Sequence, residues 1–317
     1  MQCAAPEAAR ASIRAPQRSR RRARPAMQTA FLYFVTVSVW GTSWLAISFQ
    51  LGEVNALVSI AHRMALAALL CAALTWLRRA FVPLAAADHA RIFVQGLCLF
   101  CCNYLFIYAA TESLSTGLVA VVFSTMVILN AIGGAVFLNA PLRAVVLAGG
   151  LLGMLGMIVL FYPELGTLSW NDPRLRALGA CFLGTLCASA GNLIAAGNLR
   201  RGLTVLTCNS WGMFYGAATL YLAALGLQIP IRVSLEQDYL LSLFYLAFVS
   251  TVLAFWAYMS LLARIGADRA AYTTLLFPIV ALAVSSVVED YRWTLFSVVG
   301  LLLVLGGNWL ALRGVRA

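Results

Sequence analysis

The strongest constraint on this chain is a series of apolar runs, each close to 20 residues long, that continues from Met27 almost to the last residue. A helix rises 1.5 Å per residue, so about 20 apolar residues cross the ~30 Å hydrocarbon layer of a bilayer. The connections between the runs are short. Reading at this length predicts ten membrane spans, at approximately residues 28–49, 55–77, 91–110, 115–138, 144–162, 174–199, 204–227, 239–263, 267–288 and 293–312.

Composition agrees with an integral membrane protein, since 62% of the 317 residues are hydrophobic and only 10% are charged. All 22 basic residues are arginine. Their excess could suggest nucleic acid, but seven of them precede Met27 and most others fall in short connections, which is the distribution of a topology signal. We therefore predict the lipid bilayer and a small-molecule solute as partners, no nucleic acid, and no cofactor.

Orientation follows from where the arginines fall. A cytoplasmic N-terminus places 17 of the 22 arginines on the cytoplasmic side and four on the other, which satisfies the positive-inside rule. The prediction is a multi-pass protein of the bacterial inner membrane with both termini in the cytoplasm. The first 26 residues have no apolar h-region, so we do not expect a cleavable signal peptide there. We expect residues 1–27 to be either a disordered, arginine-rich cytoplasmic arm or a segment that precedes a true translation start at Met27.

Five spans followed by five spans predicts an inverted repeat, because an odd number per half makes the second half enter the membrane with the opposite orientation. The halves are residues 28–162 and 174–312, and a shift of 150 places Tyr108 on Tyr258. The predicted fold is all-α, a polytopic membrane protein of ten transmembrane helices in two inverted five-helix repeats, with a cavity between them.

Several short motifs resemble the EamA group of the drug/metabolite transporter superfamily. They are Val39 to Trp44, Ala61 to Leu69, Ser115 to Ala120, Phe277 to Leu282 and Glu289 to Thr294. The resemblance covers nearly everything from Met27 to Arg313. It implies a ten-helix, two-repeat transporter that moves metabolites, amino acids or related solutes, often outward across a bacterial inner membrane.

Arg63 is the most informative single residue, because it interrupts the second apolar run roughly 12 Å from its start. A charge at that depth is costly and usually faces a bundle interior or an aqueous cavity. Its planar guanidinium suits a substrate carboxylate. The alternative is a structural arginine that pairs with carbonyls or with a loop acid such as Glu53.

Polar residues at helical spacing form two stripes, one in each half. Ser59 and His62 share a face with Arg63, and Thr207, Trp211 and Tyr215 follow at four-residue steps in the seventh span. We expect these stripes to face each other across one cavity. His62 is either a proton-coupling residue or a packed hydrogen-bonding residue.

The remaining candidates are spread over other spans. Trp40, Asn103, Tyr104 and Asn192 either line the cavity or make ordinary contacts between helices. Pro278 is a candidate gate, although proline is also merely tolerated in membrane helices. No metal site and no catalytic residue are predicted.

Glycines in two spans mark places where helices approach closely. Those in the fifth and tenth spans favour packing within a monomer, with a homodimer as the alternative. They are Gly149, Gly150, Gly153, Gly156, Gly300, Gly306 and Gly307.

Three classes of function remain open on the sequence. A secondary transporter leads, since the chain has no lysine and no phosphate-binding loop for ATP. A passive facilitator or a membrane receptor is the alternative, because intramembrane acids for ion coupling are scarce. A membrane-embedded enzyme is disfavoured, since no cluster of acids, bases or ligands meets a catalytic geometry. The sequence does not name the solute, the direction of transport or the coupling ion.

Overall fold

The computed structural model describes residues 16–50, 52, 54–79, 83–114, 119, 122–165, 172, 174–277, 279–280, 283 and 293–313. Within these ranges the chain is all-helical and contains no strand. In the first half the elements are α1 (Pro16–Ser48), α2 (Ala56–Leu77), α3 (Ala86–Gly96), the π-helix η2 (Leu97–Cys102), α4 (Asn103–Thr111), α6 (Met126–Leu138), α7 (Ala144–Leu160) and α8 (Tyr162–Leu165). In the second half they are α9 (Arg174–Arg200), α10 (Val205–Gly226), α11 (Gln237–Phe244), the π-helix η3 (Tyr245–Leu253), α12 (Ala254–Ile265), α13 (Ala267–Ala270), the 3₁₀-helix η4 (Ala271–Leu275) and α15 (Leu295–Arg313).

Four continuous helices among these are long and apolar enough to cross a bilayer. They are Ala56–Leu77, Ala86–Thr111, Arg174–Arg200 and Gln237–Ile265. Many large apolar side chains on the helices are exposed, which a bilayer tolerates and water does not. The chain is therefore a multi-pass membrane protein.

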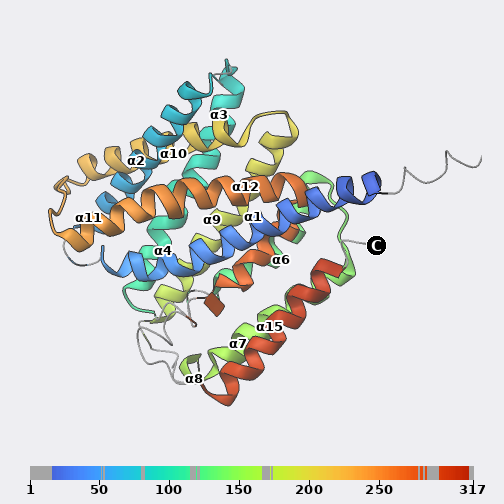
Figure 1. The fold of residues 1–317 in the computed structure, drawn as a ribbon. Helices are drawn as coiled ribbons and strands as arrows, with labels where there is room; N and C mark the ends of the chain where they lie inside the picture. The colour runs from blue at the N-terminus through green and yellow to red at the C-terminus, as the bar shows by residue number, and fades with distance from the viewer. Residues whose placement is uncertain are drawn as a thin grey trace, which may run out of the picture.

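The packing of the helices has a two-fold pattern. In Figure 1, α7 and α15 run together, and they pack against each other as α2 packs against α10. The helix α1 packs against α12, and α4 packs against α9. When the two halves of the chain are exchanged, α1 corresponds to α9 and α12 corresponds to α4. The contact between α1 and α12 therefore becomes the contact between α9 and α4. The arrangement therefore fits two repeats related by a pseudo-two-fold axis.

The helices α2 and α10 match each other closely. Each has 22 residues, and α10 begins and ends 149 residues after α2 does. Each begins with a side-chain cap: Asn55 accepts a hydrogen bond from the backbone N–H of Leu57, and Thr204 accepts one from that of Thr207. The caps fix which residues of the two helices correspond.

A π-helical segment interrupts the same long helix in each half. The segment η2 lies between α3 and α4, and η3 lies between α11 and α12, with starts 148 residues apart. Sequence periodicity predicts unbroken α-helices here, because the extra residue in a π turn barely disturbs an apolar run. Such segments occur frequently at functional sites, and both of these lie beside the cavity described below.

Glycines bring α7 and α15 into direct backbone contact. A Cβ added to Gly156 would lie 2.8 Å from the carbonyl oxygen of Gly300, and one added to Gly307 would lie 2.5 Å from that of Gly149. No side chain fits at such distances. The prediction that glycines of the fifth and tenth spans pack helices within one chain is confirmed for Gly149, Gly156, Gly300 and Gly307.

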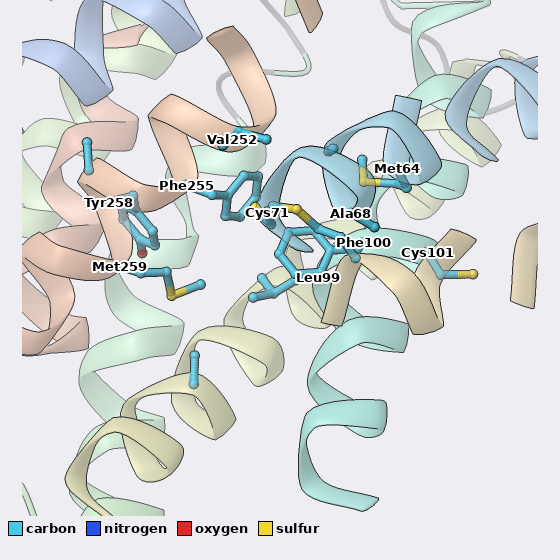
Figure 2. Packing of buried hydrophobic residues seen from close by; sticks show 14 of the residues in the cluster. Met64, Ala68, Cys71, Leu99, Phe100, Cys101, Val252, Phe255, Tyr258 and Met259 are labelled. Carbon is cyan, nitrogen blue, oxygen red and sulfur yellow. The ribbon is translucent and has the colours of Figure 1, made fainter. Parts of the chain in front are cut away.

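The largest apolar core lies where α2, η2, α10 and α12 meet (Figure 2). Phe100 is fully buried there and lies close to Phe255, with ring centroids 4.8 Å apart. Gly212 and Gly216 of α10 leave the room that the Phe100 ring and backbone occupy. The core fixes the orientation of α2, on which Arg63 lies.

The first helix is longer than the sequence suggests. We expect a disordered arm over residues 1–27, whereas α1 begins at Pro16. Arginine and alanine are good helix formers, so the helix of the first apolar run extends backward through this segment. Residues 1–15 lie outside the described part of the chain.

Candidate functional site

A cavity of about 100 Å³ lies where the two halves of the chain meet. Its walls come from α1, α2, η2, α4 and α6 in the first half of the chain and from α9, η3, α12 and η4 in the second half. Sites for drug-sized ligands are about 300–1,000 Å³, so this cavity suits a small solute.

Arg63 forms one wall of the cavity and is only 1% exposed. Its Nε donates a hydrogen bond to Oγ1 of Thr251 at 2.8 Å, and its Nη2 donates to Oγ of Ser250 at 3.1 Å. Nη2 also reaches the hydroxyl of Tyr104 at 3.3 Å, and the guanidinium carbon lies 4.7 Å from the centroid of that ring. Three hydroxyls from two other helices therefore hold the guanidinium in place.

The charge of Arg63 has no counter-charge within the described residues. The ion pairs found there, Arg91 with Asp88 and Arg174 with Asp172, involve other arginines. Glu53, the loop acid considered from the sequence, lies outside the described residues. The Nη1 atom of Arg63 is buried and lacks a hydrogen-bond partner in the part of the chain that the structure describes. A buried cation with a free donor is costly, and an anionic solute would compensate it.

Two amide side chains add unpaired acceptors to the same cavity. Asn103 and Asn192 are both buried, and the Oδ1 atom of each lacks a hydrogen-bond partner among the described residues. The Nδ2 atom of Asn192 donates to the sulfur of Met126 at 3.3 Å. An ammonium group carries three donors and would pair with these oxygens. The cavity thus offers a cation for one end of a zwitterion and acceptors for the other.

The rest of the cavity wall is largely aromatic. Trp40 lies against Phe255 and Phe277, with ring centroids 5.0 and 5.3 Å away. Its Nε1 donates to the carbonyl oxygen of Ser250 at 3.0 Å, and the Ser250 hydroxyl lies 2.6 Å from that of Ser43. These bonds join α1 to η3 beside Arg63.

Of the sequence-predicted residues, the structure brings five together in the cavity: Arg63, Trp40, Asn103, Tyr104 and Asn192. Two neighbours of Arg63 on α2 lie outside it. The Ser59 hydroxyl lies 3.1 Å from that of Tyr239, and His62 is half-buried with its ring edge-on to Tyr221 at 5.8 Å.

The stripe predicted on the seventh span also lies outside the cavity. Thr207 is buried in the first turn of α10, and Trp211 is 39% exposed. Trp211 and Tyr215 pack around His89 of α3, whose Nδ1 lies 2.8 Å from the Tyr215 hydroxyl. The expectation that this stripe faces Arg63 across the cavity is not met, because α2 and α10 pack directly against each other.

Pro278, the predicted gate, lies outside the described residues. Sequence reasoning missed Ser250 and Thr251, which hold the guanidinium, because isolated hydroxyl residues in an apolar run read as ordinary helix contacts. A clue existed in the spacing: shifting Asn103 by 148 residues, the offset of the π-helical segments, reaches Thr251.

Comparison with known proteins adds relatives over most of the chain. A "Probable amino-acid metabolite efflux pump" of Escherichia coli (strain K12) is 26% identical over 297 residues, covering 90% of this chain and 95% of that protein. The protein of the same description in Salmonella typhimurium (strain LT2) is 26% identical with the same coverage, and Protein PagO of that organism is 22% identical over 286 residues.

A solved crystal structure shares the fold. It is 16% identical in sequence and has a TM-score of 0.74, covering 91% of this chain and 97% of the other. The EamA-like transporter family matches residues 27–162 and 175–313, which makes two copies in one chain. This protein belongs to the EamA-like transporter family.

Proposed function

We propose that this protein is a secondary exporter of a small amino-acid-like solute and that Arg63 binds the solute's carboxylate. One observation carries the proposal: a buried guanidinium in the central cavity keeps an unpaired Nη1 atom and has no acidic partner among the described residues. The names of two relatives, which refer to amino-acid metabolite efflux, agree with a solute of this class.

The proposed architecture is ten spans in two inverted repeats, over residues 28–162 and 174–312, with both termini cytoplasmic. The exchange-symmetric pairing of helices and the matched π-helical segments support the two repeats, and the distribution of arginines supports the cytoplasmic termini. Alternating access would then expose the cavity to each side in turn as the two halves rock against each other.

Direct binding is the first test. Purified protein is screened by thermal shift against amino acids, their amides and their decarboxylated amines. A solute at 100 times its dissociation constant adds about 2.7 kcal/mol of stability. We expect stabilisation by an amino acid and little by the matching amine, which lacks the carboxylate. Equal stabilisation by both would remove the carboxylate from the proposal.

Transport is the second test, with the solute found in that screen loaded into proteoliposomes. Arg63→Lys keeps the charge but loses the planar fork, so we expect slower efflux. Arg78→Lys is the matched control, because Arg78 lies exposed after α2. Efflux with and without an imposed proton gradient separates coupled transport from facilitation. Unchanged efflux in a folded Arg63→Lys protein would count against Arg63 as the binding residue.

A further inference from the structure

A second cavity of about 780 Å³ lies between α6 and α9, away from the central one. Its walls are mostly apolar and include Ile132 and Phe137 of α6 and Leu186 and Ala190 of α9. All four residues are exposed. Because α9 is a membrane-length helix, this groove faces the bilayer.

One end of the groove is basic. Arg91, Arg200 and Arg201 line it, and the last two lie where α9 ends. Arg200 donates from Nη1 to the carbonyl oxygen of Leu138, the last residue of α6, at 2.6 Å, so the two helix ends lie together. Asn198 donates to Gln95 at 2.8 Å, which holds α3, and with it Arg91, at the same end.

The arginines keep donors to spare. Arg91 pairs with Asp88 at 3.1 Å, while neither Arg200 nor Arg201 forms an ion pair within the described ranges. A guanidinium has five N–H donors, and Arg200 uses one of them on Leu138. The basic end therefore has at least two uncompensated charges and is suited to phosphate oxygens.

The length of the groove fits one lipid leaflet. From Leu186 to Gly197 the apolar wall of α9 rises about 16 Å, close to half of the ~30 Å hydrocarbon layer. An acyl chain in the groove would thus place its headgroup at the arginines. A soluble anion would use the arginines and leave the apolar wall without a role.

We propose that the groove between α6 and α9 is a binding site for an anionic phospholipid, with its phosphate held by Arg200 and Arg201 and an acyl chain along α9. Bilayer lipids would fill any apolar groove, so the selectivity for negative charge comes from the arginines. Each arginine near a membrane surface strengthens the binding of an anionic lipid about fivefold.

The test uses the full-length protein in nanodiscs of phosphatidylcholine and phosphatidylglycerol. Co-purified lipid is measured after transfer to detergent and washing. Wild type should retain phosphatidylglycerol preferentially. The double variant Arg200→Gln/Arg201→Gln should lower that preference about thirtyfold. The control Arg78→Gln/Arg79→Gln removes two exposed arginines from the connection before α3 and should keep the preference within about twofold of wild type.

A third variant tests the acyl chain. Ala190→Phe fills the groove and leaves the arginines intact, so retention of phosphatidylglycerol should fall. If the Ala190→Phe protein does not fold, Ile132→Trp on the opposite wall of the groove serves the same purpose. Equal retention of the two lipids by wild type would overturn the proposal. The proposal would also fail if both double arginine variants lost the same amount of phosphatidylglycerol, or if glycerophosphoglycerol raised the unfolding temperature of the protein as much as the intact lipid does. A third contrary outcome is a protein without lipid preference that forms a dimer, if Ala190→Phe dissociates that dimer.

Discussion

Arg63→Met should separate transport from stability. Methionine fills a similar apolar volume without the charge, and three hydroxyls lose the guanidinium: those of Thr251, Ser250 and Tyr104. Two of these hydroxyls have other partners. Thr251 donates to the carbonyl oxygen of Leu246 at 2.7 Å, and the Ser250 hydroxyl lies 2.6 Å from that of Ser43. The substitution therefore leaves those two hydroxyls paired.

The free energies nearly cancel. A hydrogen bond between membrane helices contributes about 0.6 kcal/mol on average, so the three bonds of Arg63 amount to about 2 kcal/mol. An arginine at the centre of a membrane costs about 2.5–3.5 kcal/mol relative to water. We expect Arg63→Met to unfold at nearly the wild-type temperature or a few degrees above it.

Transport should respond very differently. A hydrogen bond from Nη1 to a solute carboxylate is charge-assisted and contributes about 1.5–3 kcal/mol, so its loss weakens solute binding about 10- to 150-fold. Efflux from proteoliposomes and thermal unfolding in detergent measure the two effects on one preparation. Efflux within threefold of wild type would refute the assignment of Arg63 to binding. A fall of many degrees in the unfolding temperature would show that the arginine is mainly structural.

Three further substitutions test the packing of α7 against α15 and the other polar residues around Arg63. Gly307→Val adds a Cβ 2.5 Å from a carbonyl oxygen of α7 and should destabilise the protein by about 1–3 kcal/mol in thermal unfolding. Gly179→Ala should not, because no atom of the described residues lies within 4 Å of the added Cβ. Thr251→Val removes the acceptor of Arg63 Nε and should raise the KM for the solute about three- to tenfold, with Thr251→Ser restoring it. Asn192→Leu should weaken binding of an amino acid but not of the corresponding deaminated acid, as competition assays would show.

The membrane character and the repeat could be predicted from the sequence because both depend on features that tertiary packing does not change. Apolar runs of fixed length report the hydrocarbon thickness, and the odd number of predicted spans per half implies inversion. Caps such as Asn55 and Thr204 mark helix starts by local chemistry. The π-helical segments were out of reach, because one extra residue per turn leaves an apolar run apolar.

Some residues of the cavity could likewise be predicted from the sequence, and others could not. Arg63 and Asn192 are visible because polar groups inside a span need a reason. Their neighbours Phe255 and Phe277 are not, because an aromatic residue facing a cavity has the same sequence signature as one facing lipid or core. The sequence did not show which way the Trp211 side chain points, because a stripe of residues on one helix does not identify the neighbouring helix that the stripe contacts.

The register of α2 and α10 shows how a two-fold fold can build a one-sided site. With the caps aligned, Arg63 corresponds to Gly212, and His62 corresponds to Trp211. Gly212 has no side chain and packs on the Phe100 ring, so the second half places no cation at the position equivalent to Arg63. A zwitterion has two unlike ends, and symmetric walls would offer both ends the same partner. In the proposed function, Arg63 on one side only gives the cavity a cation for one end of such a solute and leaves the other end to different partners.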